Sequence, residues 1–483
     1  MDRILNGPDF ITPIPLVSIG IRLFEKLKEK EDDVLYVDVS KDTKLTNKEF
    51  LILCCKLAES LRNCGFKQND VLAISAENSI YYNVPTVAGL FLGMITGFIN
   101  QNYTKNEFLH LLNIYQPKII FMSSKLLQFF ESSDSIKIVI LDEEEIPGYD
   151  NLNMFIKKYC EPNFLIKNFK PVDVNTIEQL AFIASSSGTT GLSKAVMITH
   201  DNTAIRVNHI SDPRFSLAKK EVVLLVVPNF HVFGILVSIC GIINGNKLVI
   251  MQRFDEETYL KSIEKYKITN LPIVPTIIYS FRQIYGLTES TFGITVMPTG
   301  ETKVGSSGKI VPGMSLCICD EFGNRLGPNQ RGEINLKGRM VTKGYYRNPK
   351  ATKTTFIDGW LHTGDVGYYD EEGFVFIVDR LKDLIKYKGF QVPPAEVEGI
   401  LISHPNVKAA CVVGKPDEFA GELPTGFVVK QPNSNVTEEE LIQFVAERIS
   451  KTKHLHGGIY FWDELPLTAS GKIQRHILRD SFK

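Results

Sequence analysis

The sequence lacks any long uninterrupted hydrophobic run and any excess of charge of one sign. Its longest apolar stretches, residues 84–99 and 233–243, are interrupted by Gly or Thr and fall short of the ~20 residues that a bilayer span needs. Both predict buried helices instead. The 54 lysines and arginines balance 55 aspartates and glutamates, so no surface for nucleic acid or an anionic membrane is expected. These absences exclude a transmembrane segment and favour small-molecule partners.

The sequence also lacks cysteines spaced to bind a metal. Its eight cysteines are scattered, and none forms a C-x-x-C pair or a His/Cys set with zinc-ligand spacing. Reduced, mostly buried thiols in an intracellular compartment are therefore expected. No secretory signal is visible, and the final residues, Ser481-Phe482-Lys483, differ from a Ser-Lys-Leu peroxisomal address.

Short Val- and Ile-rich runs alternate along the chain with longer segments of helical period. The predicted strands are residues 71–75, 118–122, 137–141, 221–227 and 247–251, and the predicted helices are residues 105–115 and 256–266. This alternation indicates an α/β fold, with mostly parallel sheets in a large, multi-layered N-terminal domain.

A smaller domain is predicted to follow residue 380. Pro393-Pro394 marks a helix start near Ala395, because proline is tolerated in the first helical turn. Helices at 397–403 and 438–449 and strands at 407–413 and 426–430 would form an α+β unit of about 100 residues. The predicted division is 1–380 and 381–483, with a hinge at residues 379–382.

The strongest local pattern is a cluster of hydroxyls, two glycines and a lysine within residues 185–194. Hydroxyl donors, glycine backbone freedom and a positive charge suit a phosphate chain. The spacing is not that of the G-x-x-x-x-G-K-[ST] loop, and an ordinary polar hairpin is the alternative interpretation. The candidate phosphate-binding residues are Ser185, Ser186, Ser187, Gly188, Thr189, Thr190, Gly191 and Lys194.

Two further segments follow apolar runs. His231 lies just past a predicted strand, where open α/β sheets bind ligands, although a satisfied core histidine fits the pattern equally well. Thr288 and Glu289 follow the turn at Tyr285-Gly286. A hydroxyl there could hold a phosphate oxygen, and a carboxylate could hold a hard cation such as Mg²⁺.

Two more segments carry charged candidates. Asp365 and Arg380 could bind ribose hydroxyls or form a surface ion pair. Lys472 lies in a Gly-containing turn near the C-terminus, where a lysine is usually solvated. If the small domain moves onto the large one, this lysine could instead bring positive charge to a transition state.

In this order and at these separations, the five segments resemble the adenylate-forming (AMP-binding) enzymes: acyl-CoA synthetases, coumarate-CoA ligases and beetle luciferases. The resemblance runs from about Phe24 to Leu478 and is closest to the beetle luciferase-like branch, through residues 206–213 and 384–389. It implies that a carboxylate attacks the α-phosphorus of Mg-ATP to give an acyl-adenylate, from which coenzyme A then displaces AMP. Many relatives are peroxisomal, so the peroxisome and the cytoplasm both stay open.

The resemblance also implies residue roles for the nucleotide. Residues 185–194 would cradle the β- and γ-phosphates, with Tyr285 and Gly286 in the nucleotide-binding turn. Thr288 would contact the α-phosphate, and Glu289 would hold Mg²⁺. Asp365 and Arg380 would bind the ribose.

The acid and the two half-reactions take the remaining roles. His231 and Phe233 would shape the acyl pocket, with Arg206 at its far wall. Lys472 would stabilise the pentacovalent phosphorus during adenylation, and Lys386, on the opposite face of the small domain, would enter for the thioester step.

The chain departs from the family pattern most strongly at Phe281. There, family members carry a helix, a strand, a Gly-Gly-Ala type turn that stacks on adenine, and another helix, whereas here Phe281 runs directly into Arg282. Smaller departures are Ser193 and Ala195, where Pro and Gly are usual. Losing a strand strips its neighbours of hydrogen-bond partners. The sequence therefore predicts an internal deletion near 281/282 and a chain that adenylates poorly or not at all.

Three interpretations follow. The first is an ATP-dependent acyl-CoA ligase for a hydrophobic, fatty carboxylic acid. The second is a luciferase-type monooxygenase, which oxidises the adenylate with oxygen. The third is a catalytically impaired isoform, because the adenine-binding segment is missing.

Overall fold

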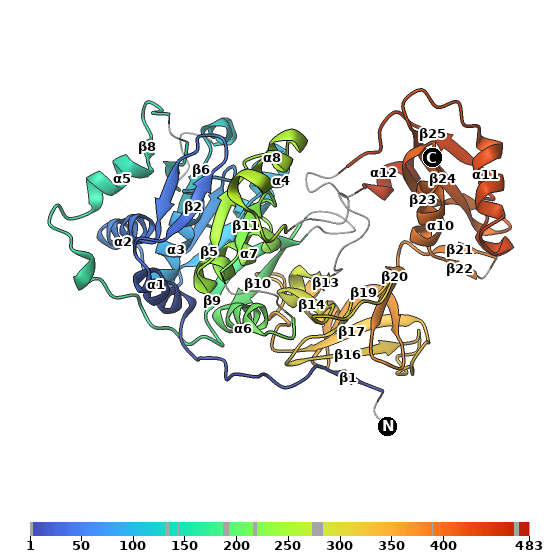
Figure 1. Cartoon of the computed structure of the whole chain (residues 1–483), viewed down its shortest axis with the longest axis horizontal. Coiled ribbons are helices and arrows are strands. Elements are labelled where there is room, and N and C mark those ends of the chain that lie inside the picture. The colour runs from blue at the N-terminus through green and yellow to red at the C-terminus, as the bar shows by residue number, and fades with distance from the viewer. Residues whose placement is uncertain are drawn as a thin grey trace. The chain divides into compact units, whose positions relative to one another are not determined.

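Figure 1 shows the computed structural model of the chain. The structure describes residues 3–130, 136–142, 144–186, 193–215, 220–272, 284–388, 390–467 and 473–482. The chain divides into two compact units. The larger comprises Leu5–Ser315 and Leu336–Leu361, and the smaller comprises Met1–Ile4, Leu316–Asn335 and His362–Lys483.

A seven-stranded sheet organises the first part of the larger unit. Its order is β10-β9-β5-β4-β6-β7-β8, with parallel neighbours except for the antiparallel β9–β10 pair. The strands are β4 (Val71–Ser75), β5 (Ile95–Phe98), β6 (Ile119–Met122), β7 (Lys137–Ile140), β8 (Asp150–Asn151), β9 (Leu180–Ser186) and β10 (Lys194–Thr199). The central strands β4, β5 and β6 are buried along their whole length, as expected for a parallel sheet covered on both faces.

Two smaller sheets complete the larger unit. The four-stranded sheet has the order β11-β12-β2-β3, and the three-stranded antiparallel sheet has the order β13-β14-β15. The strands are β2 (Val34–Asp38), β3 (Lys44–Thr46), β11 (Val222–Leu225), β12 (Lys247–Ile250), β13 (Ile284–Leu287), β14 (Phe292–Val296) and β15 (Lys309–Ile310).

Helices cover these sheets and pack with them in separate hydrophobic clusters. The helices are α1 (Ile19–Glu29), α2 (Asn47–Asn63), α3 (Asn83–Phe91), α4 (Lys105–Tyr115), α5 (Leu152–Tyr159), α6 (His200–Ser211), α7 (Val232–Asn244), α8 (Glu256–Tyr266) and α9 (Pro349–Thr355). Of the two predicted buried helices, 233–243 is confirmed as α7. Residues 84–99 are not one helix but α3 and then β5, because Gly93 turns the chain at φ 65° between them.

The smaller unit contains a five-stranded sheet around its own core. The strands of this sheet are β21 (Ile385–Tyr387), β22 (Phe390–Val392), β23 (Val407–Asp417), β24 (Gly421–Lys430) and β25 (Ile459–Phe461). The unit also contains strand β20 (Val375–Arg380) and helices α10 (Pro394–Ile402), α11 (Glu438–Ala446) and α12 (Arg475–Asp480). Three strands, β16 (Met314–Cys319), β17 (Gly332–Gly338) and β19 (Trp360–Tyr369), cross from one unit to the other along the chain, and the two-residue strands β1 (Leu5–Asn6) and β18 (Phe356–Ile357) lie in the larger unit. The predicted α10 start is confirmed, with proline in its first turn.

The division between the units falls at 361/362, upstream of the predicted boundary at 380/381. The functional division at residues 379–382 stays a prediction. Among the described residues no helix is long and apolar enough to cross a membrane.

Acid should destabilise the larger unit through two buried histidines of α6. Burial lowers the pKa of His200 and of His209 to about 4. Each binds a proton near pH 6.5 when unfolded but only near pH 4 when folded, so stability is present above pH 6.5 and falls as the pH drops toward 4. We expect a loss on the order of 2–3 kcal/mol per histidine over this window. Urea midpoints that stay constant between these two pH values would contradict this expectation.

Candidate active site

The predicted phosphate-binding segment lies on a β-hairpin. In the antiparallel β9–β10 pair, Lys194 is opposite Ser186 and Ala195 is opposite Ser185. Ser186 is buried and Ser185 is half-buried. The remaining predicted residues, Ser187, Gly188, Thr189, Thr190 and Gly191, lie outside the described residues. The strands that flank the pattern therefore pair as in a hairpin. The phosphate-binding role stays a prediction.

The end of this hairpin is fixed by α4. The hydroxyl of Tyr103 lies 3.2 Å from Ser193 Oγ, and His110 Nε2 lies 3.2 Å from the Ser193 carbonyl oxygen. The hydroxyl of Ser193 thus has a partner that a proline at this position would lack. These contacts hold the start of β10, and with it the backbone of Lys194, in place.

Tyr345 joins Lys194 to Glu289, and sequence reasoning missed it. Lys194 Nζ lies 4.6 Å from the centre of the Tyr345 ring, and the Tyr345 hydroxyl donates a 2.9 Å hydrogen bond to Glu289 Oε1. Burial and the neighbouring Glu289 carboxylate raise the pKa of Tyr345, so the phenol stays protonated. Tyr345 therefore contacts both Lys194, predicted to bind phosphates, and Glu289, predicted to hold Mg²⁺.

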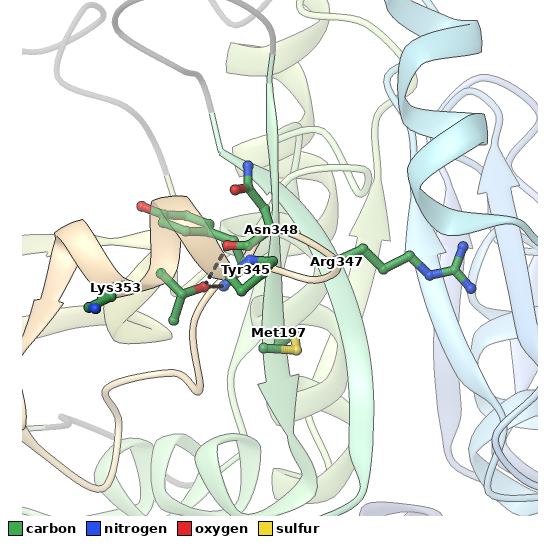
Figure 2. A pocket seen from close by; sticks show the side chains of 7 residues that line it. Met197, Tyr345, Arg347, Asn348 and Lys353 are labelled. Carbon is green, nitrogen blue, oxygen red and sulfur yellow. Dashed lines mark hydrogen bonds between the residues drawn. The ribbon is translucent and has the colours of Figure 1, made fainter.

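The backbone around Tyr345 is fixed on two sides. Met197 N donates to Gly344 O (3.0 Å) and Tyr346 N donates to Ala195 O (2.7 Å), which ties this segment to β10. On the other side, the Thr352 hydroxyl accepts from Tyr345 N and donates to Asn348 O, at 2.9 Å each. Figure 2 shows the two bonds of Thr352, beside a cavity of about 380 Å³. Because Arg347 and Lys353 extend in opposite directions there, no charged groups converge on a ligand position.

Removing the Tyr345 hydroxyl should weaken this arrangement. We expect Tyr345→Phe to lower the free energy of unfolding by about 0.5–1.5 kcal/mol, because Glu289 loses a donor in a partly buried place. Urea unfolding measures the change. Tyr346→Phe is the matched control, and its midpoint should stay at the wild-type value; equal losses in the two variants would refute the contribution of the Tyr345–Glu289 bond.

Tyr285 and Gly286 lie in strand β13 and not in the predicted turn, and their pairing with β14 requires glycine for a steric reason. Tyr285 is buried in β13, and a Cβ built on Gly286 would lie 2.0 Å from the carbonyl oxygen of Phe292 on β14. The short 3-10 helix η4 (Thr288–Ser290) follows at once and places Thr288 in a buried position. The Thr342 backbone N–H donates to the Glu289 carbonyl at 2.9 Å. The close strand approach thus fixes the turn that carries both predicted ligands.

The predicted acyl-pocket residues meet around Phe292, which sequence reasoning also missed. The rings of Phe233 and Phe292 stack with centroids 4.6 Å apart and planes at 13°. The Arg206 guanidinium lies 4.9 Å from the centre of the same Phe292 ring. His231 caps α7, where its Nδ1 accepts from Phe233 N at 3.3 Å. The cap is a structural role for His231, and its predicted contact with substrate stays a prediction.

The remaining predicted residues belong to the smaller unit. Asp365 and Arg380 are direct cross-strand partners on β19 and β20, and Arg380 Nε lies 3.1 Å from Asp365 Oδ1. The two residues thus form the ion pair of the alternative interpretation, with Asp365 buried and Arg380 half-exposed, and the ribose-binding role stays a prediction. Lys386 is exposed on β21, and Lys472 lies outside the described residues.

The residues present are suited to a nucleotide with a bound cation. Among the described residues Lys194 makes no ion pair, so its charge is available to an anion such as a phosphate chain. No group of three or more His, Cys, Asp or Glu side chains forms a metal cage in the described part of the chain. Mg²⁺ is usually held by one or two carboxylates together with substrate phosphates and water, so the single carboxylate of Glu289 is sufficient.

The chain matches the family model of AMP-binding enzymes over residues 23–283 and 279–346, and that of the AMP-binding enzyme C-terminal domain over residues 396–472. It therefore belongs to the AMP-binding, adenylate-forming enzyme family. Its mixed α/β architecture, with a large N-terminal and a smaller C-terminal part, is the fold of that family.

Named relatives include luciferases and ligases. The chain is 38% identical to the luciferin 4-monooxygenase of Photuris pensylvanica, with 100% of this chain and 98% of the relative covered. It is 33% identical to the Probable 4-coumarate–CoA ligase 3 of Dictyostelium discoideum, with 99% of each covered. Among solved structures, ATP-bound MatB from Rhodopseudomonas palustris superposes with a TM-score of 0.87 at 25% identity, covering 96% of this chain and 99% of MatB.

Proposed function

We propose that this protein is an ATP-dependent, AMP-forming acyl-CoA ligase for a hydrophobic carboxylic acid. The observation that carries the proposal is the Lys194–Tyr345–Glu289 arrangement beside the β9–β10 hairpin. Lys194, which makes no ion pair among the described residues, lies 4.6 Å from the centre of the Tyr345 ring, and the Glu289 carboxylate lies 2.9 Å from the Tyr345 hydroxyl. A cation for the phosphates and a carboxylate for their metal ion suit a metal-bound phosphate chain. The named coumarate-CoA ligase relative supports the reaction type.

In the first half-reaction the acid's carboxylate oxygen attacks the α-phosphorus and the bond to pyrophosphate breaks. Lys194 and the hairpin would neutralise the leaving phosphates, Thr288 would donate to an α-phosphate oxygen, and Glu289 would hold Mg²⁺. When bound, the cation would offset the charge of the phosphate oxygens. The chain's own contribution is to hold these groups in line with the acid, since positioning supplies much of the rate.

The second half-reaction transfers the acyl group to the thiol of coenzyme A and releases AMP. We assign the ion pair of buried Asp365 and half-exposed Arg380 to the ribose, and Lys386 to the thioester step. The stacked Phe233 and Phe292 rings support an apolar acid, of which a fatty acid is the simplest, because aromatic surface binds apolar groups.

The second candidate is a luciferase-type monooxygenase, which the 38% identity to the Photuris luciferase favours. Adenylation is common to both, so the fate of the adenylate separates them. AMP release that depends on coenzyme A supports the ligase. An oxygen-dependent flash with luciferin, without thioester formation, supports the monooxygenase and rejects the ligase.

The third candidate, an impaired isoform, concerns this chain rather than its family. The two parts of the family match, 23–283 and 279–346, meet at the predicted deletion. The comparison with the Photuris luciferase extends over 541 positions, although this chain has 483 residues. The joint at 281/282 lies outside the described residues. We infer that the segment missing from this joint is needed to hold adenine.

A further inference from the structure

Two arginines of the larger unit, one buried and one half-buried, have no acidic partner among the described residues. Arg206 of α6 is only 7% exposed, and Arg22 of α1 is half-buried. The Arg206 Nε and one terminal nitrogen of Arg22, Nη1, are buried and have no hydrogen-bond partner. Among the described residues no carboxylate acts on either guanidinium.

Both guanidiniums act on the same buried thiol. Cys240 of α7 is 1% exposed, and α7 packs against both α1 and α6. Burial raises the pKa of the Cys240 thiol to about 11 although Arg206 and Arg22 both lower it. The thiol is therefore neutral near pH 7 and cannot balance the two positive charges.

A buried and a half-buried positive charge without a balancing anion are unfavourable. Arginine stays protonated in proteins, and a buried guanidinium without a carboxylate loses hydration that nothing restores. The ring of Phe292, 4.9 Å from Arg206, offers only a cation–π contact, which is weaker than a bidentate carboxylate pair. The arrangement fits a ligand that supplies the missing negative charge.

The position of these arginines indicates which part of a ligand would reach them. Phe292 contacts both Phe233 and Arg206, so Arg206 adjoins the aromatic wall assigned to the acid. Cys240 lies two helical turns beyond Phe233 on α7, about 10 Å along the axis. Arg206 therefore lies beside the aromatic pair, and Cys240, on which both arginines act, lies farther along α7.

We propose that the acid activated by this protein carries a second carboxylate at its remote end, bound by Arg206 and Arg22. This inference rests on the proposed ligase function and replaces a simple fatty acid by a dicarboxylic acid with an apolar middle. The middle contacts Phe233 and Phe292, and the remote carboxylate pairs with the guanidinium groups. A monocarboxylic acid would leave both guanidiniums desolvated and unpaired, so it binds more weakly.

The test compares straight-chain acids with their dicarboxylic counterparts, from butyrate and butanedioate to dodecanoate and dodecanedioate. Calorimetric titration of the 483-residue chain measures binding of each acid, which does not require adenine. We expect the best dicarboxylate to bind about 10- to 100-fold more tightly than its monocarboxylate partner, the range for a charge-assisted pair. Equal binding, tighter binding of monocarboxylates, or no binding of any acid would overturn the proposal.

Variants separate recognition from folding. Arg206→Met and Arg22→Met should each lower the preference for the dicarboxylate at least several-fold, and Arg206→Lys should retain part of it. Because each methionine variant removes an unpaired buried charge, its unfolding midpoint should not fall. Lys26→Met, which removes a partly exposed lysine paired with Glu29 on α1, is the matched control and should keep the preference. A preference that survives in Arg206→Met would overturn the proposal.

A parallel pyrophosphate exchange assay, on the protein with the segment near 281/282 restored, keeps the two proposals apart. Exchange that is faster with dicarboxylates supports both. Exchange with monocarboxylates alone overturns the second carboxylate and leaves the ligase function standing. Exchange with none of the acids, together with tight dicarboxylate binding, rejects the ligase function but not the recognition of the remote carboxylate.

Discussion

Lys472→Ala, made in a protein with the missing segment restored, should slow adenylation about 100- to 1,000-fold, the cost of removing one preorganised donor from a developing charge. In the proposed mechanism Lys472 stabilises the pentacovalent phosphorus of the first half-reaction and has no role in the second. Thioester formation from supplied acyl-adenylate should therefore stay within a few-fold of the parent. Single-turnover rates of the two half-reactions measure the split.

The matched control is Lys386→Ala, which should show the opposite pattern, with slow thioester formation and near-normal adenylation. Lys386 is exposed on β21, so its removal should not disturb folding. Equal losses in both half-reactions for Lys472→Ala would contradict the assignment of separate roles to the two lysines.

Restoring the segment near 281/282 should raise the free energy of unfolding by several kcal/mol, a large share of the ~5–15 kcal/mol typical of a folded protein. The family resemblance implies that the missing piece holds a strand and two helices, each of which would cover apolar surface and pair backbone groups. The urea dependence should also steepen, because more surface is exposed on unfolding. Urea titrations of the two chains measure both quantities, and identical midpoints would refute a structural lesion.

The regular elements of the fold could be predicted because their patterns are local. The α4 and α8 bounds, 105–115 and 256–266, coincide with the helical periodicity, and the five predicted strands of the larger unit agree to within two residues. Residues 84–99 were predicted as one helix because a continuous apolar run has the same appearance whether it is helix or strand. The glycine at 93, with φ 65°, was the available signal for the break.

Site residues could be predicted from the sequence only where they belong to a recognisable motif. Lys194 and Glu289 each stand in a recognisable segment, but Tyr345, which links them, is more than fifty residues from either and belongs to no chemical pattern. Phe292 follows the short helix η4, and its ring contact with Phe233 joins β14 to α7, two elements about sixty residues apart in the chain. Arg22 and Arg206, 184 positions apart on two helices, both act on Cys240, which a single sequence does not reveal.

The most direct measurement of the central claim is ATP–pyrophosphate exchange with the panel of mono- and dicarboxylic acids, run on the 483-residue chain beside a chain with the segment restored. The account predicts acid-dependent exchange in the restored protein and little or none in the shorter one. Equal exchange in both would contradict the proposed need for the missing segment, and no exchange in either would contradict the proposed ligase function.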